Sequence, residues 1–503
     1  MEFDVVVVGG GSAGCVLAAR LSEDPHRRVL LIEAGPDHPD PATLPSDVVD
    51  ASVPTVEHDW GYSADAELDR GISLPRARLM GGCSATNACF ALRGAPAVYD
   101  GWAAMGNPGW SFHDVLPFFR RLESDTDFAD EWHGADGPIP IRRHPRQEMN
   151  AAQAAFLDGA IASGHPAIDD HNRPGAVGAG PTPRNVVDGV RMSTALTYLA
   201  GARSRPNLTI LPDTLTARVE LANGRACGVR LLDGDVIDAG RVVLAAGAYA
   251  SPAILLRSGI GPPDQLGALG IPVGVALSGV GAHLVDHPII GVDVPTRPPG
   301  PNQRFQAMLT FRSSECGSDD PADLLLFASG PYDVPPSQVP SGAVFAIVAA
   351  IVAPKSEGWV QLRSTDPEEP PRIHLGHLSH ADDLPRMVEA VIEARRIARR
   401  APMAAIATGP ELSPGPAIDD DDLDALTSWI TAGVGTYHHP VGTCTMGSEP
   451  DAGAVVDARG AVHGIDDLYV ADASIMPSVP TATTNLPTIM VAERIAELLR
   501  SDS

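Results

Sequence analysis

The first 35 residues place a buried strand, a glycine-rich turn and a second strand in the order of a dinucleotide-binding βαβ unit. Val5–Val8 is an unbroken run of valines, which is typical of a strand covered on both faces of a parallel sheet. Gly9, Gly11 and Gly14 follow it at G-x-G-x-x-G spacing. Glycine at these positions permits a tight turn, close approach of the backbone to a pyrophosphate, and close packing of helix on strand. The next helix would direct its N-terminal N–H groups at the phosphates.

An acidic residue ends the second strand of this unit. Val29–Ile32 is apolar and Glu33 follows it directly. A carboxylate here can accept both ribose hydroxyls of an adenosine, and it disfavours a 2′-phosphate. The pattern therefore predicts FAD or NAD rather than NADP.

Length and charge restrict the class of protein. A chain of 503 residues exceeds one ordinary hydrophobic core, so two domains are expected. The net charge of −27 and the lack of a basic run argue against binding to nucleic acid or an anionic membrane. The longest apolar stretch, Ala343–Val352, is about half of what spans a bilayer.

The cysteines and the N-terminus suggest the compartment. The first strand starts at Asp4, which leaves no room for a secretory signal. The six cysteines form no C-x-x-C pair and are too sparse for a disulfide scaffold. We therefore expect reduced thiols in a cytoplasmic protein. The spacing of histidine and cysteine predicts no metal site.

The pattern of apolar, polar and turn-forming residues changes along the chain. Between residues 208 and 243, short alternating strands are separated by Asn223-Gly224 and Asp233-Gly234, both strong hairpin signals. Residues 296 to 430 hold apolar strands and a helical run, Asp382–Arg400, and are the expected second domain. A last helix is expected near Thr488–Leu499.

Several segments together resemble one family. They are ARLMGGCSATNACFALRG (Ala77–Gly94), GAYASPAILLRSGIG (Gly247–Gly261), HLVDHP (His283–Pro288), PKSEGWVQL (Pro354–Leu362) and YVADASIMP (Tyr469–Pro477). In this order they resemble the signatures of the glucose–methanol–choline (GMC) family of flavin-dependent alcohol oxidoreductases. Met80, Cys83 and Thr86 depart from the commonest residues of the first signature.

The resemblance implies an α/β fold with two domains. A Rossmann-like FAD-binding domain would be assembled from the discontinuous segments 1–150, 188–295 and 432–503. An α+β substrate-binding domain with an antiparallel sheet would comprise 151–187 and 296–431. The residues expected to contact FAD are Gly9, Gly11, Ser12, Ala13, Gly14, Glu33, Ala34, Gly81, Gly82, Asn87, Ala88, Val219, Ala246, Gly247, Asp472, Ala473, Pro487 and Thr488.

The resemblance also implies how the flavin is held. Some choline-oxidising members attach FAD through a histidine of the first signature, and Thr86 stands at the matching position here. Threonine has no nucleophilic nitrogen, so we expect non-covalent FAD. The N–H groups at the start of the C-terminal helix would stabilise the anionic reduced flavin if they face its N1–C2 edge.

Oxidation of an alcohol at a flavin requires a base for the hydroxyl proton and a donor that holds the oxygen. The segment GTYHHPVGTCTMG (Gly435–Gly447) resembles the family's catalytic strand, whose base is the histidine before proline, here His439. Asn485 matches the position of a second His or Asn, and its amide would donate to the substrate oxygen.

His438 competes with His439 for the role of base. On a strand, two successive imidazoles face opposite sides, so only one would reach the flavin. The resemblance favours His439. His283 and His287 are expected to form structural hydrogen bonds.

Other readings stay open at this point. A lyase of the same fold binds FAD without net redox turnover and cleaves cyanohydrins, whereas a photodecarboxylase branch lacks the catalytic histidine. Trp60, Trp102 and Trp110 are either core residues or a cage for a quaternary ammonium, and only their placement distinguishes the two. The apolar character of residues 296 to 430 favours a neutral alcohol or a sugar-like metabolite over a charged substrate. The sequence does not specify the electron acceptor or the oligomeric state.

Overall fold

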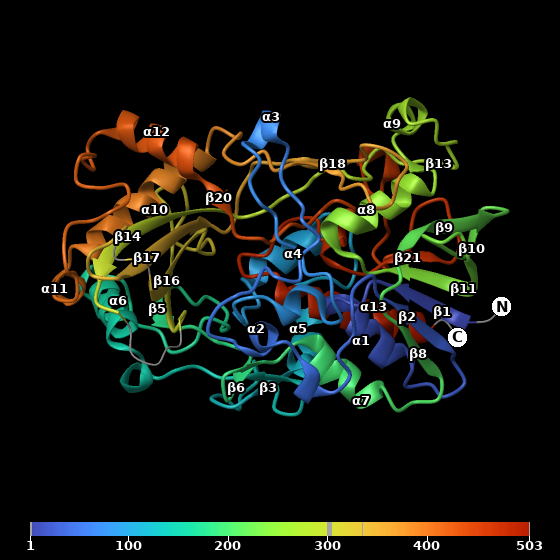
Figure 1. The fold of residues 1–503 in the computed structure, drawn as a ribbon, viewed down its shortest axis with the longest axis horizontal. Helices are drawn as coiled ribbons and strands as arrows, with labels where there is room; N and C mark the ends of the chain where they lie inside the picture. Colours follow the sequence, from blue (N-terminus) through green and yellow to red (C-terminus); the bar gives the residue numbers. More distant parts are fainter. Residues whose placement is uncertain (1–2, 299–303, 334, 336, 502–503) are drawn as a thin grey trace.

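The computed structural model describes residues 3–298, 304–333, 335 and 337–501. Two sheets lie at opposite ends of the long axis of the molecule, with α4 (Pro96–Ala104) and α5 (Phe112–Leu122) between them (Figure 1).

The first sheet has the strand order β8-β2-β1-β11-β10-β9, and β21 also pairs with β11. Its parallel part comprises β8 (Leu208–Leu211), β2 (Val29–Ile32), β1 (Phe3–Val8), the C-terminal half of β11 (Val236–Leu244) and β21 (Leu468–Val470). The N-terminal half of β11 pairs instead with the antiparallel hairpin β9 (Thr216–Ala222) and β10 (Arg225–Leu231). The hairpin turns expected at residues 223–224 and 233–234 are therefore confirmed.

Helices α1 (Ser12–Leu21) and α13 (Asn485–Ser501) pack against each other beside this sheet. Val5–Val8, Val29–Ile32 and the inner faces of both helices are buried in one large apolar core. The last helix begins three residues earlier than the sequence suggested. Pro487 is accommodated because the N–H that proline lacks would have no partner in the first turn of a helix.

The second sheet is antiparallel and has the order β20-β14-β17-β16-β15-β5. Its strands are β20 (Gly435–Thr436), β14 (Pro288–Thr296), β17 (Ala343–Ile351), β16 (Leu324–Asp333), β15 (Ala307–Phe311) and β5 (Gly178–Pro181). Side chains alternate between its two faces. Phe345, Ile347 and Leu326 lie in a core with the helices α6 (Ala151–Ala162), α10 (Asp383–Ala398) and α12 (Leu423–Gly433).

The opposite face of the second sheet carries Met308, Leu325 and Phe327, which cluster with Phe90 from the first signature. Strand pairing places β14 in this sheet, although its residues fall in a segment expected to belong to the FAD domain. The domain limits given above remain a prediction. Among the described residues, no helix combines the length and the apolar content needed to cross a bilayer.

Candidate active site

One cavity of about 570 Å³ connects the first sheet to the second. At one end it is lined by the glycine-rich turn after β1, including Gly9 and Gly11. At the other end it is lined by Phe327 and Val348 of the second sheet and by His438 and His439. The cavity therefore brings residues together from the start, the middle and the end of the chain.

The glycines of the first turn are required by close backbone approach. Gly9 has φ +100°, and a Cβ there would lie 2.6 Å from the Ala245 carbonyl oxygen. A Cβ at Gly14 would lie 1.7 Å from the carbonyl oxygen of Gly9. At Gly11 the nearest atom to an added Cβ is the Cα of Gly82, at 3.8 Å. A Cβ at Gly82 would lie only 2.6 Å from the Cα of Gly11, so the two glycine-rich turns pack directly against each other.

Three helices begin at the wall of this cavity. Ser12 and Ala13 of α1, Gly247 and Ala248 of α8 (Gly247–Arg257), and Asn485 of α13 all line it. None of the three helices has an acidic residue in its first turn. Their positive N-terminal ends suit the pyrophosphate and the electron-rich edge of FAD, so the residues present fit this cofactor.

Glu33 is held rigidly at the nucleotide end. Its Oε2 accepts a hydrogen bond from the backbone N–H of Gly10 at 2.7 Å, and its Oε1 accepts one from Gly35 at 2.8 Å. Burial raises the pKa of Glu33 to about 7, although these N–H groups oppose the shift. The side chain lines the cavity next to Ala34.

Asp472 joins two elements of the same wall. Its Oδ2 accepts hydrogen bonds from Gly247 N–H at 2.8 Å and from Ser251 Oγ at 2.6 Å. Its Oδ1 caps the short turn after β21 by accepting from Ser474 N–H at 2.8 Å. The carboxylate therefore fixes the N-terminus of α8 against the C-terminal end of β21.

Most residues expected to contact FAD line the cavity, but four do not. Gly14 and Gly81 lie behind the turns, where Gly81 N–H donates to the Gly10 carbonyl at 2.7 Å. Val219 is buried in β9 with its N–H bonded to Ser258 Oγ, and Pro487 is buried inside the first turn of α13. The expected residues that line the cavity are Gly9, Gly11, Ser12, Ala13, Glu33, Ala34, Gly82, Asn87, Ala88, Ala246, Gly247, Asp472, Ala473 and Thr488.

His439 is anchored through its backbone and its ring. Its N–H donates to Asp286 Oδ1 at 2.7 Å, while Thr436 Oγ1 donates to the other oxygen of the same carboxylate. Its ring Nδ1 lies 3.0 Å from Nδ1 of His287, with the two rings nearly perpendicular. Burial, together with the nearby His287 and Arg76, holds the pKa of His439 well below its usual range. The imidazole is therefore neutral, as a base requires.

His438 also lines the cavity, and the expectation that the two histidines lie on a strand with their rings on opposite sides does not hold. The reason is local backbone geometry. Strand β20 ends at Thr436, and His438 has φ +65°, which breaks the alternation of a strand. The backbone carbonyl of His438 accepts a hydrogen bond from Arg76 Nη2 at 2.8 Å. Burial lowers the pKa of the His438 imidazole to about 3.

Asn485 presents an unused donor. Its Oδ1 accepts a hydrogen bond from Ser12 Oγ at 3.1 Å, which fixes the orientation of the amide. Its Nδ2 is buried and has no hydrogen-bond partner. A buried donor without a partner is costly unless a ligand satisfies it. The amide of Asn485 is therefore set up to bind an acceptor in the cavity that His439 also lines.

An aromatic wall adjoins His439. The rings of Tyr437 and Phe327 stack with centroids 5.0 Å apart, and Phe90 meets Phe327 edge-on at 5.6 Å. Phe305 extends the row, at 5.4 Å from Phe90. The hydroxyl of Tyr437 is buried without a partner.

The cationic side chain at this end of the cavity is that of Arg76, and the carboxylate of Asp286 lies behind the wall, bound to His439 N–H. Arg76 lines the cavity and acts electrostatically on both His438 and His439. Among the described residues that line the cavity, the carboxylates are those of Glu33, Asp472, Glu368 and Glu369. The first two are bound to backbone N–H groups, and the last two lie in the loop between β18 (Trp359–Gln361) and β19 (Arg372–His374).

The tryptophans do not form a cage. Trp102 and Trp110 are fully buried in the core of the first domain. Trp60 lines the cavity, but the guanidinium of Arg78 already covers its ring at 4.9 Å from the centroid. The core interpretation therefore holds for two of the three.

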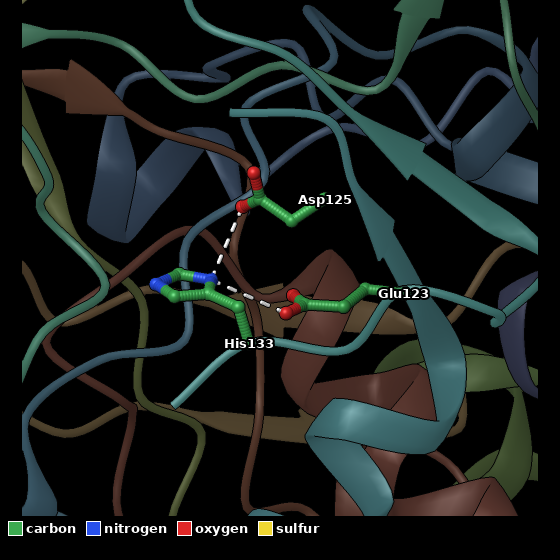
Figure 2. Close-up of side chains that lie close together, drawn as sticks. All are labelled: Glu123, Asp125 and His133. Carbon is green, nitrogen blue, oxygen red and sulfur yellow. Dashed lines mark ion pairs between the residues drawn. The ribbon is translucent and has the colours of Figure 1, made fainter. Parts of the chain in front are cut away.

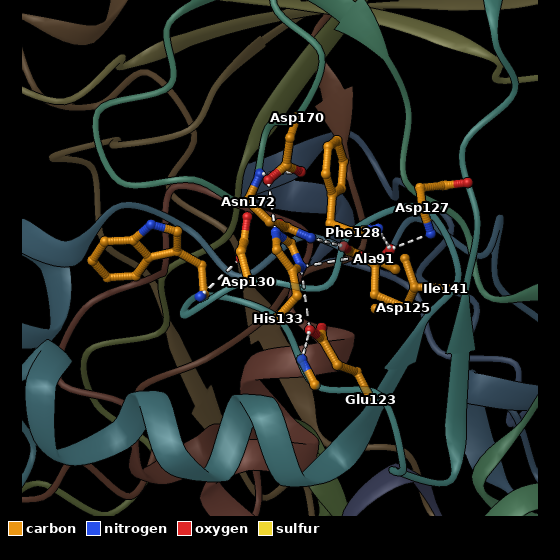
Figure 3. A network of polar contacts seen from close by, with 12 residues as sticks. Ala91, Glu123, Asp125, Asp127, Phe128, Asp130, His133, Ile141, Asp170 and Asn172 are labelled. Carbon is orange, nitrogen blue, oxygen red and sulfur yellow. Dashed lines mark hydrogen bonds and ion pairs between the residues drawn. The ribbon is translucent and has the colours of Figure 1, made fainter.

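A second cluster of titratable groups lies outside the cavity. Ligand-type atoms of Glu123, Asp125 and His133 lie within 4.8 Å of one another (Figure 2). Nδ1 of His133 is 3.1 Å from Asp125 Oδ2, and Nε2 is 3.0 Å from Asp170 Oδ2 (Figure 3). The spacing of these residues in the sequence gave no hint of this cluster.

The cluster is balanced by internal cations. Burial lowers the pKa of His133, but hydrogen bonds to Asp125, Asp170 and Glu123 outweigh this and raise it to about 10. Arg143 bonds Asp125 at 2.8 Å and Asp170 at 2.7 Å, and Arg93 pairs with Glu123. Three carboxylates thus meet three cations, and a metal ion would face two guanidinium groups. The arrangement is a buried ion-pair network rather than a metal centre.

Sequence reasoning did not single out Arg76, Asp286 or Tyr437, and it gave His287 only a structural role. The sequence did point to the region of Asp286 and His287, because HLVDHP is one of the segments that carry the family resemblance. Nothing in the sequence placed that segment beside residues 436–439, because the two are about 150 residues apart.

A Rossmann-type sheet, two facing glycine turns and a cavity that ends at an imidazole and an unpaired amide define a flavin-dependent oxidoreductase of two domains. The sequence matches the family profiles of the GMC oxidoreductases over residues 3–289 and 354–492. It is 36% identical to 5-(hydroxymethyl)furfural oxidase from Methylovorus sp., over 99% of this chain and 98% of that protein. It is 34% identical to oxygen-dependent choline dehydrogenase 1 from Chromohalobacter salexigens, over 99% and 95%.

Among solved structures, pyridoxine 4-oxidase from Mesorbium loti superposes with a TM-score of 0.90 at 31% identity, covering 99% of both chains. The chain therefore belongs to the GMC oxidoreductase family and is an FAD-dependent oxidoreductase that acts on alcohols.

Proposed function

We propose that this protein oxidises the CH–OH group of an uncharged alcohol to a carbonyl, with His439 as the base and Asn485 as the donor that holds the substrate oxygen. One observation carries the proposal: the unpaired Nδ2 of Asn485 and the neutral ring of His439 line the same cavity as the nucleotide turns. When bound, FAD supplies the hydride acceptor.

The chain's own residues would divide the work as follows. His439 takes the hydroxyl proton, and its lowered pKa keeps it unprotonated beforehand. Asn485 donates to the oxygen as negative charge develops there, with its amide held by Ser12. The rings of Tyr437, Phe327 and Phe90 exclude water around the reacting carbon.

The charge of the wall supports an uncharged substrate. A quaternary ammonium would meet Arg76 and would find no free carboxylate among the described residues beside His439. The aromatic row instead suits a flat, neutral alcohol. The site therefore favours a substrate that resembles 5-(hydroxymethyl)furfural over one that resembles choline, the compounds named in the two relatives.

We also expect the flavin to be held without a covalent bond, because Thr86 lines the cavity where a histidine would be needed. Acid precipitation should release free yellow flavin into the supernatant. Flavin retained in the pellet would contradict this. The six free cysteines support a cytoplasmic location.

The test of the function is anaerobic mixing with a panel of alcohols. Benzyl alcohol and 5-(hydroxymethyl)furfural should bleach the oxidised flavin band, whereas choline should do so at least tenfold more slowly. Cleavage of mandelonitrile without bleaching of the flavin band would instead show that the protein is a lyase of the same fold. Re-oxidation by oxygen or by an acceptor dye then distinguishes an oxidase from a dehydrogenase.

Two variants test the base. His439→Ala should retain FAD and slow flavin reduction by about 10²–10⁴-fold. His438→Asn is its matched partner on the same cavity wall, with an expected loss of less than tenfold. If the two effects are exchanged, the base is His438.

A further inference from the structure

We propose that His287 is a positioning residue that sets the tautomer of His439, so that the lone pair of the base lies on Nε2. This inference rests on the proposed role of His439. It starts from one contact, in which the Nδ1 atoms of the two rings lie 3.0 Å apart.

Only one of the two facing nitrogens can carry the hydrogen, since two lone pairs at this distance repel and two N–H groups clash. If His287 donates, Nδ1 of His439 is the acceptor and its Nε2 carries the proton. That tautomer cannot take a proton at Nε2. If His439 donates from Nδ1, its Nε2 is bare and can act as the base.

The proposed role of His439 as the base selects the second arrangement, in which His287 is the acceptor. His287 is fully buried, and burial lowers its pKa to about 3, so it is neutral and has one N–H only. Its Nε2 has no hydrogen-bond partner among the described residues, so the contact with His439 is the hydrogen bond that its ring makes there. With the proton on Nε2, Nδ1 of His287 is left as the acceptor.

The same contact assists the reaction itself. When His439 takes the hydroxyl proton on Nε2, it becomes an imidazolium whose Nδ1–H already points at a neutral acceptor. The carboxylate of Asp286 does not play this part, because its oxygens accept from His439 N–H and Thr436 Oγ1. Asp286 fixes the backbone of the base, and His287 fixes its ring.

The experiment compares the holoenzymes of His287→Leu, His287→Gln and His283→Leu by anaerobic flavin reduction. His287→Leu should keep its FAD content and substrate Kd but reduce flavin at least tenfold more slowly. His287→Gln should recover to within about threefold of wild type, because its Oε1 can accept from Nδ1–H. His283 lies in the same segment but has an exposed side chain that pairs with Glu357, so His283→Leu should behave as wild type.

A spectroscopic measurement covers the case in which His287→Leu does not fold. In ¹⁵N-histidine NMR of wild type, the signals lost in His439→Ala should be those of a protonated Nδ1 and a bare Nε2. A protonated Nε2, or unchanged reduction by His287→Leu with FAD and Kd intact, would overturn the inference. Normal reduction by His439→Ala would instead overturn the proposed function, so the two failures are distinguishable.

Discussion

His133 and His439 are both histidines enclosed by protein, yet they hold opposite charge states. His133 faces carboxylates with both ring nitrogens, and its pKa rises to about 10. His439 faces another neutral imidazole and the positive Arg76, and its pKa falls well below its usual range. The difference shows that the partners of the ring, and not burial alone, decide whether an enclosed histidine is a cation or a base.

The two regions also differ in how their polar groups are paired, since each charged group of the network has an oppositely charged partner although Arg93 Nε, Arg143 Nε and Glu123 Oε2 have no hydrogen bond. In the ion-pair network, His133 bonds both Asp170 and Asp125, which ties the loop at Asp170 to β3 (Glu123–Asp125) (Figure 3). Arg143 bonds the same two carboxylates. In the cavity, Nδ2 of Asn485 and the hydroxyl of Tyr437 have no partner. The first region is built for stability and the second for binding a ligand.

The largest effect is expected from breaking the ion-pair network. His133→Leu leaves three buried carboxylates against two guanidinium groups, so it should lower the stability of the protein by about 3–5 kcal/mol. The midpoint of urea unfolding measures this. Arg142→Ala, which removes the exposed pair with Glu148, is the control and should cost less than about 1 kcal/mol. Equal midpoints for the two variants would show that the network adds nothing.

Removal of the unpaired amide donor of Asn485 should have an effect nearly as large, but on the rate of flavin reduction rather than on stability. Asn485→Ala should slow flavin reduction about 10²–10³-fold with little change in unfolding, because the donor acts on charge that develops in the transition state. Ser12→Ala, which only frees the amide to rotate, should give a smaller loss in the same direction. A loss below threefold for Asn485→Ala would remove it from the mechanism.

A carboxylate placed beside the base should make His439 resemble His133. His287→Glu should raise the pKa of His439 by about 1–3 units, against the opposing influence of Arg76 and His438. The rate of flavin reduction should then fall as the pH is lowered through that new pKa, while the plateau at high pH stays near wild type. Stopped-flow measurements from about pH 4 to 9 compare the acid limb of the flavin-reduction rate in this variant with that of wild type. An unmoved limb would show that position 287 does not act on the base.

The last comparison concerns the contribution of His133 to the pH dependence of stability. Its folded-state pKa of about 10 lies above the ordinary value of 6.5, so its contribution is complete below pH 6.5 and is lost as the pH rises toward 10. Urea midpoints should fall between pH 7 and 9.5 in wild type and fall less in His133→Gln. Parallel curves for the two proteins would contradict the raised pKa.

Much of the nucleotide half of the site could be predicted from sequence. Val5–Val8, the three glycines and Glu33 are local signals, since a turn that needs positive φ or close backbone approach leaves its mark on adjacent residues. The same holds for the hairpins at residues 223–224 and 233–234. The family resemblance added His439 and Asn485, which local patterns do not distinguish from other polar residues.

The amino-acid sequence by itself determined the dinucleotide fold, because the periodicity and the glycine spacing of a βαβ unit are properties of about 35 consecutive residues. Only the tertiary structure decided which groups act on each histidine. His287 meets His439, and His133 meets Asp170, across 152 and 37 residues of chain. A pKa depends on atoms within a few ångströms, and folding brings those atoms together from segments whose spacing in the sequence carries no information about the contact.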